Sequence, residues 1–91
     1  MKPITINKKV VIQKIDDRLV AFDIDNSRFY SFNKTAGIIF QLLKKQMTEK
    51  EIADYLCKKY NVNYTKAVQD VKNTIIDLQQ KKIITRSART K

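Results

Sequence analysis

The chain has 91 residues, 43% of them hydrophobic, which is enough for one small domain. Its 19 Lys and Arg against 9 Asp and Glu give a net charge of +10 and favour acidic partners such as nucleic acid, an anionic membrane or an acidic peptide. No His, one Cys and one Gly exclude a His/Cys zinc site, an internal disulfide and the glycine-rich loops that bind phosphates.

The first third of the chain has the pattern of β-strands. Alternating residues rich in β-branched and aromatic types predict strands over 10–15, 19–24 and 28–32. The intervening segments 16–17 and 25–27 have turn composition. Because both turns are short, we expect an antiparallel meander in which the third strand lies at an edge.

After residue 33 the apolar period becomes helical. A first helix is expected over 35–45 with Asn33 as its cap, and Thr48 with Glu51 forms a capping box that begins a second. Asn63 can cap a third helix that runs to about Lys82, followed by a short extended segment over 83–85. The predicted fold class is α+β, a three-stranded antiparallel meander followed by three helices, with parts like those of a winged helix-turn-helix. We expect one domain over 1–85 and a basic C-terminal tail over 86–91.

Neither a signal peptide nor a membrane-spanning segment is apparent. The longest apolar run, residues 37–40, is far shorter than the ~20 residues that span a bilayer. The single Cys57 suits a reducing compartment, and its helical spacing favours a small buried side chain over a reactive thiol. We therefore expect a cytoplasmic protein with no membrane partner.

The acidic residues do not form a catalytic or metal-binding pattern. Asp16, Asp17, Asp23 and Asp25 lie near the two turns, where short acidic side chains are common. The segment 23–27 resembles the start of a calcium loop, but Arg28 and Lys34 occupy the positions of its glycine and bidentate glutamate. We expect no catalytic residues, no metal, no cofactor and no enzymatic activity.

The parts of a winged helix raise DNA binding as the alternative function. The third helix would then read the duplex, and helical geometry predicts which of its residues face outward. These are Lys66, Gln69, Asn73, Asp77 and Gln80, with Asp70 on the flank. That face is nearly neutral, and two acids would be repelled by phosphates, so a DNA-binding transcriptional regulator is the less favoured function.

Two features favour a peptide site instead. Ile76 lies about 140° around the third helix from Val71, off the core stripe. The third strand has aromatic residues on both faces and carries neither Pro nor an inward charge to protect its edge. An unprotected edge beside an apolar helix flank is typical of sites where a peptide adds as a strand. The same edge leaves a homodimer open.

The segment 29–40 resembles the "YY-x-LN-x-T-A/G…I-W" signature of the PqqD family, whose members include RiPP recognition elements. Further matches follow in order: residues 47–48 and 51–52 for "G-x-T…E-I", Leu56 and Tyr60, 70–71 for "D-V", and Leu78 with 82–84 for "L…G-L-I". The resemblance covers about residues 8–85. The sequence departs from it at Phe32 for Leu, Phe40 for Trp, and Met47 and Lys82 for glycines.

The resemblance implies a non-catalytic peptide chaperone. Family members bind the leader of a ribosomally made precursor as an added strand between the third strand and the third helix. They present it to a modifying enzyme, either a radical SAM enzyme or a leader peptidase, in natural-product or cofactor biosynthesis. Carried over here, the peptide-binding residues are Arg28, Phe29, Tyr30, Ser31, Phe32, Val71, Lys72, Ile75, Ile76 and Gln79.

Overall fold

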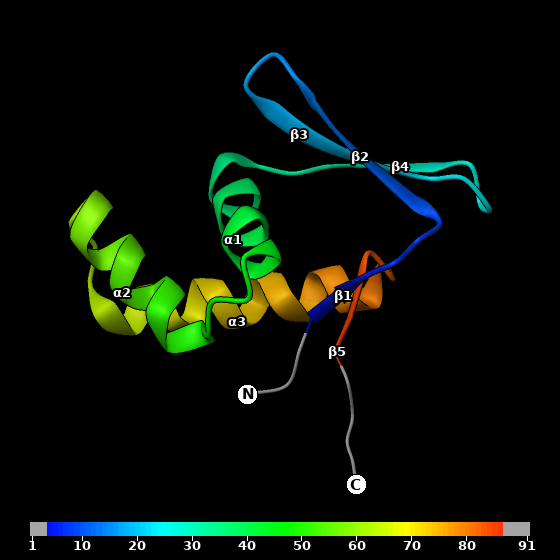
Figure 1. Cartoon of the computed structure of the whole chain (residues 1–91). Coiled ribbons are helices and arrows are strands. Elements are labelled where there is room, and N and C mark those ends of the chain that lie inside the picture. Colours follow the sequence, from blue (N-terminus) through cyan, green and yellow to red (C-terminus); the bar gives the residue numbers. More distant parts are fainter. Residues whose placement is uncertain (1–3, 87–91) are drawn as a thin grey trace, which may run out of the picture.

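The computed structural model describes residues 4–86 and has the order β1 β2 β3 β4 α1 α2 α3 β5 (Figure 1). The strands are β1 (Ile4–Ile6), β2 (Val10–Ile15), β3 (Arg18–Asp23), β4 (Arg28–Ser31) and β5 (Ile84–Arg86). The helices are α1 (Lys34–Lys44), α2 (Glu49–Tyr60) and α3 (Tyr64–Gln80). The predicted α+β class, with a three-stranded meander before three helices, is confirmed.

Strands β2, β3 and β4 form an antiparallel sheet in that order, so β4 is an edge strand within the described chain. In its register Phe22 is opposite Phe29, and Ala21 is opposite Tyr30. Because side chains alternate between the two faces, Ala21 and Tyr30 point toward the helices and the two phenylalanines point away. The predicted edge position of the third strand is confirmed.

Side chains at the helix starts cap the helices as the sequence indicated. Asn33 accepts a hydrogen bond from the backbone N–H of Ala36 at 2.8 Å. Thr48 and Glu51 form the complete capping box, with bonds of 3.1 and 2.8 Å between the side chain of each and the backbone N–H of the other. These bonds satisfy backbone donors that a helix start leaves unpaired.

A second, two-stranded sheet was not predicted. Strands β1 and β5 pair antiparallel, with Thr5 opposite Thr85, and so join the two ends of the domain. Ile4 and Ile84 from this sheet are buried in the core. Three residues are too few to show an alternating pattern, so β1 cannot be recognised from its residues alone. Strand β5 also includes Arg86, which we had assigned to the tail; residues 87–91 lie outside the described residues.

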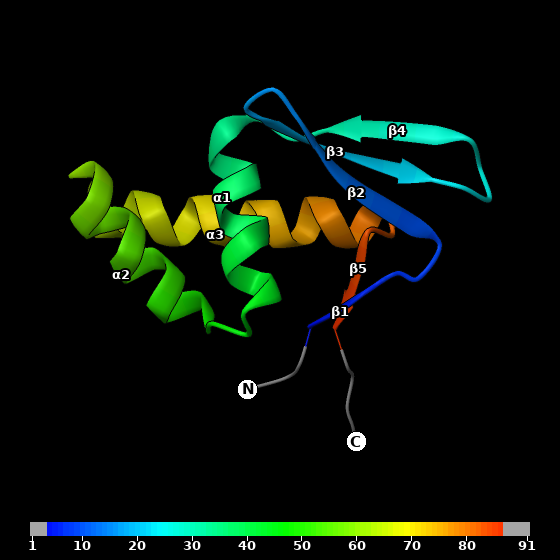
Figure 2. The ribbon, with the colours of Figure 1, turned by 45° about the horizontal axis from the view of Figure 1, so that its top comes forward.

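Helix α3 is the long base on which the other elements lie (Figure 2). Helix α1 crosses it, α2 packs beside its N-terminal half, and the three-stranded sheet lies over its C-terminal half. Fully buried side chains of the core include Phe32, Ile39, Phe40, Ile52, Val71 and Leu78. Cys57 is half-buried and packs against this core. No helix within residues 4–86 is long and apolar enough to cross a bilayer.

Candidate functional site

The edge strand β4 is joined to the end of α3 by a polar contact. The Tyr30 hydroxyl donates to Oδ2 of Asp77 at 2.8 Å. Lys81 lies at the C-cap of α3, where its ammonium group is 2.6 Å from Oδ1 of Asp77 and 4.9 Å from the centroid of the Tyr30 ring. We had placed Asp77 on the outward face of α3, and this was wrong, because its carboxylate turns toward β4 and is half-buried there.

This contact shifts the pKa of both acids in opposite directions. Burial, together with the hydrogen bond to Asp77, raises the pKa of Tyr30 to about 12. The hydrogen bond from Lys81, with that from Tyr30, lowers the pKa of Asp77. The neutral phenol and the ionised carboxylate are therefore the forms that hold β4 against α3 across the neutral pH range.

An aromatic stack fixes the C-terminal end of β4 against α1. The Tyr30 and Phe32 rings meet edge to face with centroids 5.0 Å apart, and Phe32 lies 5.1 Å from Phe40 of α1. Phe32 is only 1% exposed, so it belongs to the core. The strand thus has a fixed position between α1 and α3, while one of its edges has no strand neighbour within residues 4–86.

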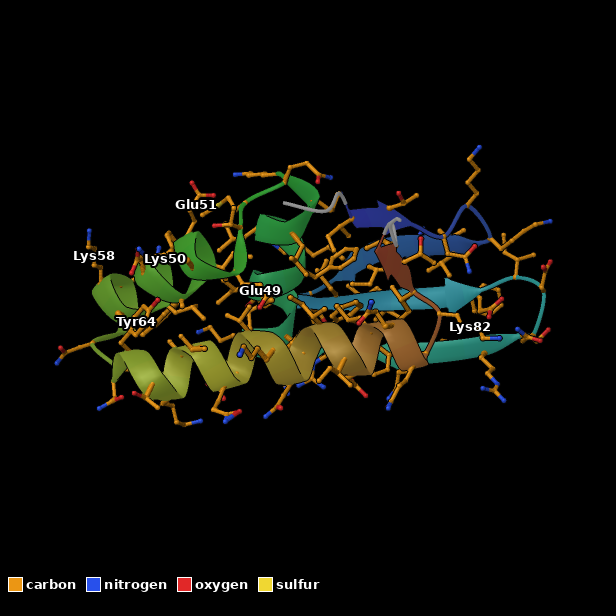
Figure 3. All side chains as sticks on the ribbon, turned by 90° about the horizontal axis from the view of Figure 1, so that it is seen from below. Glu49, Lys50, Glu51, Lys58, Tyr64 and Lys82 are labelled. Carbon is orange, nitrogen blue, oxygen red and sulfur yellow. The ribbon has the colours of Figure 1, made fainter. Side chains whose placement is uncertain are left out.

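The predicted site residues fall into two groups. The exposed or half-buried group contains Arg28, Phe29, Tyr30, Ser31, Lys72, Ile76 and Gln79. Phe29 is 66% exposed and Ile76 is 52% exposed, which is high for large apolar side chains. The other group, Phe32, Val71 and Ile75, is at most 3% exposed, so these side chains support the surface from below. β4 runs past the C-terminal end of α3 in Figure 3, and the Tyr30–Asp77 hydrogen bond joins the two elements.

A small cavity of about 160 Å³ opens between β4, the inner face of the sheet and the end of α3. Its lining residues are Val10, Ala21, Asp23, Arg28, Phe29, Tyr30, Lys81 and Ile83. The lining mixes apolar and charged groups. Arg28 lies opposite Asp23 in the strand register and Lys81 is paired with Asp77, so the charges are largely balanced and the cavity suits a small apolar or polar side chain. Sequence reasoning missed Lys81 and Ile83, because the end of α3 gives no sign that the chain folds back against the sheet.

A larger hollow of about 910 Å³ lies away from this cleft, where the β2–β3 turn faces α1. It includes Asp16 and Asp17, which the sequence analysis identified as turn residues. At the next turn, Asn26 donates to Asp23 from its side chain at 2.9 Å, and this bond lowers the pKa of Asp23. Within residues 4–86 no group of three or more acidic or Cys side chains is close enough to hold a metal ion.

The fold and the β4–α3 cleft define a small α+β domain with an open sheet edge beside a helix. Residues 18–84 match the family described as "Coenzyme PQQ synthesis protein D (PqqD)", and the chain belongs to this family. The resemblance read from the sequence is thus confirmed. Comparison with curated protein sequences gives no significant match.

Two solved structures have the same fold. One is described as "Lasso peptide synthetase B1 complexed with the leader peptide"; it has 21% identity and a TM-score of 0.86, over 90% of this chain and 96% of that one. The other is described as "TbiB1 in Complex with the TbiA(beta) Leader Peptide"; it has 24% identity and a TM-score of 0.82, over 93% of this chain and 99% of that one.

The family's two glycine positions can now be compared with the backbone. Lys82, which stands where the family has a glycine, has a φ of 61°. In the loop before α2 the positive φ falls on Gln46, at 63°, and not on the neighbouring Met47. A left-handed backbone favours glycine, so Lys82 keeps the backbone conformation that explains the glycine of its relatives.

Proposed function

We propose that this protein is a non-catalytic chaperone that binds the leader region of a ribosomally made precursor peptide. The observation that carries the proposal is the edge of β4, which lies beside α3 with exposed Phe29 on one element and exposed Ile76 on the other. Both neighbours with this fold are described as complexes with leader peptides. Membership of the PqqD family supports the same function.

In this proposal the leader pairs its backbone with β4 and extends the sheet by one strand. Backbone pairing accepts many sequences, so selectivity comes from the side chains along the cleft. Apolar leader residues that face the helix would contact Tyr30 and Ile76, above the buried Val71 and Ile75. Arg28, Lys72 and Gln79 would meet polar or acidic leader groups, and Ser31 leaves room beside the strand. Phe32 holds the strand from within the core.

The leader would then be presented to a separate modifying enzyme. A radical SAM enzyme or a leader peptidase is the kind of partner that the family implies, in natural-product or cofactor biosynthesis in the cytoplasm. The net charge of +10 supports attraction to an acidic leader or enzyme surface. No step of this function requires a catalytic group, metal or cofactor from this chain.

The alternative, a winged-helix DNA-binding regulator, has no support from the family or from either neighbour. On the outward face of α3, Lys66 is already paired with Asp70 at 2.9 Å. That pair leaves little unbalanced positive charge to contact phosphates. We therefore do not propose DNA binding.

The test is a calorimetric titration of the protein with the synthetic leader of a short precursor encoded beside it. We expect binding in the micromolar to nanomolar range, about −8 to −12 kcal/mol. A peptide of the same composition in scrambled order is the control. The absence of binding at high micromolar concentration would refute the proposal, and salt-sensitive duplex binding in a gel shift would favour the alternative.

A further inference from the structure

A row of apolar side chains crosses the outer face of the three-stranded sheet. Val11, Phe22 and Phe29 are aligned by the strand register, Val11 opposite Phe22 and Phe22 opposite Phe29. Their exposed fractions are 41%, 40% and 66%. The Phe22 and Phe29 rings meet edge to face with centroids 6.2 Å apart and an interplanar angle of 86°. The row therefore faces away from the helices and has no charged member.

Phe29 is the end of this row. On one side it packs against Phe22, and on the other side β4 has no strand neighbour within residues 4–86. Directly opposed residues of adjacent strands have Cβ atoms about 5 Å apart, so a strand added to β4 would place one side chain against the open side of Phe29. The next outward position along β4 is Ser31, which offers a small polar side chain instead.

We propose that Phe29 forms an outer subsite for the bound peptide, which takes an apolar or aromatic side chain pointing away from the helices. The proposal rests on the proposed function, since it needs a strand added to β4. It differs from the cleft between β4 and α3, because the outward side chain never contacts α3. Side chains of the peptide are thus recognised on both faces of the extended sheet.

Because side chains alternate along a strand, this subsite predicts a sequence pattern in the bound peptide. Neighbours of the outward residue in the added strand point inward, toward Arg28 on one side and Tyr30 on the other. The first of these meets the rim of the 160 Å³ cavity, where Arg28 lies opposite Asp23 and Lys81 is paired with Asp77, and it favours a polar residue. The second lies on the inner side beside the Tyr30 ring and favours an apolar residue. The preferred peptide therefore contains a polar, an apolar and a second apolar residue in succession, in either chain direction.

The peptide is a better occupant of this subsite than a second copy of the chain. Two copies that meet through this face would bring together net charges of +10 each, which repel. A short peptide does not carry this charge and meets no comparable repulsion, and an acidic peptide is attracted. The outer subsite is thus part of the peptide site and not a dimer interface.

The experiment selects binders from a displayed library of short random peptides on the immobilised full chain, and compares it with the Phe29→Thr variant. Threonine keeps the strand preference of the site but removes the apolar surface. Ile15→Thr is the matched control, because Ile15 is 53% exposed on the same face but on β2, at the opposite edge of the sheet. Thermal unfolding of each variant verifies that the domain is folded.

On the wild type and on Ile15→Thr we expect enriched peptides with two adjacent apolar residues next to a polar one. On Phe29→Thr the preference at the outward position should disappear while the inward preferences persist, and selected peptides should bind about two- to fivefold more weakly. Identical enrichment on all three proteins would overturn the outer subsite. A dimer in sedimentation that Phe29→Thr dissociates would overturn it in favour of a second copy. Enrichment of no peptide on any protein would instead contradict the proposed function.

Discussion

The hydroxyl of Tyr30 and the carboxylate of Asp77, 47 positions apart in the chain, form a 2.8 Å hydrogen bond that joins β4 to α3. The bond lies on the inner side of β4, where the proposed peptide would bind between strand and helix. Lys81 contacts both partners, the carboxylate at 2.6 Å and the ring at 4.9 Å. The spacing of strand and helix at the site thus depends on a three-residue polar cluster and not on apolar packing alone.

Replacing Tyr30 by Phe should destabilise the domain. The change removes the hydroxyl and leaves the half-buried carboxylate of Asp77 with Lys81 as its partner, and the loss of one such bond costs about 1 kcal/mol. Chemical unfolding of the two proteins measures the difference. Tyr64→Phe is the control, since Tyr64 is 44% exposed at the start of α3. Equal losses in the two variants would show that the Tyr30–Asp77 bond does not hold β4.

Alkaline titration should separate one tyrosine from the others. The pKa of Tyr30 is raised to about 12, above the ordinary value of about 10, because folding favours its neutral form. The stability it contributes is fully present below about pH 10 and is lost as the pH rises toward 12. Tyrosinate absorbance should show a late step in the folded protein, among the four tyrosines, that is absent from Tyr30→Phe. A late step that persists in the variant would assign the shift to another residue.

Acid should weaken the same contact by protonating the Asp77 carboxylate. The pKa of Asp77 is lowered, first by the hydrogen bond from Lys81, so its contribution to stability is present above about pH 4 and is lost as the pH falls through its folded value. Asp77→Asn should therefore unfold with a shallower dependence on pH below about 4 than the wild type. Unfolding midpoints measured across the acid range give this slope, and parallel curves for the two proteins would exclude a role for Asp77.

Replacing Ile76 by Asp should weaken peptide binding without unfolding the domain. Ile76 is 52% exposed, so a charge there costs little in folding, whereas it would remove an apolar contact and repel an acidic leader. We expect at least a tenfold loss of affinity, or about 1.4 kcal/mol, in calorimetry with the leader peptide. Val62→Asp is the control, since Val62 is 39% exposed in the loop between α2 and α3. Unchanged affinity in Ile76→Asp would remove this residue from the site.

Glycine at position 82 should stabilise the protein. Lys82 has a φ of 61°, and a left-handed backbone costs a side chain with a Cβ about 1 kcal/mol, part of which glycine loses again to the entropy of the unfolded chain. We expect a net gain of about 0.5 kcal/mol in the free energy of unfolding. Gln80→Gly, in the last turn of α3, should instead destabilise by about 0.5–1 kcal/mol. A loss of stability in Lys82→Gly would show that the lysine side chain contributes more than its backbone costs.

The local parts of the fold could be predicted because their signals lie within a few residues of each other. The strands over β2–β4 follow from alternation, and the helix starts follow from Asn33 and from the Thr48–Glu51 capping box. For the site, the position of Ile76 off the core stripe was also foreseen, since it depends on the period of its own helix. Strand β1 was missed, because three residues show no period and its partner is 80 positions away.

The sequence by itself determined the elements, the absence of a basic reading face on α3, and the edge position of β4, because each depends on local period, charge or the order of short connections. Only the tertiary structure decided which side chains meet. It turned Asp77 toward Tyr30, buried Phe32, Val71 and Ile75 beneath the surface, and brought Lys81 and Ile83 to the cavity beside β4. Helical geometry gives the direction of a side chain on its own helix, but the element that packs against that face depends on how the whole chain buries its apolar surface.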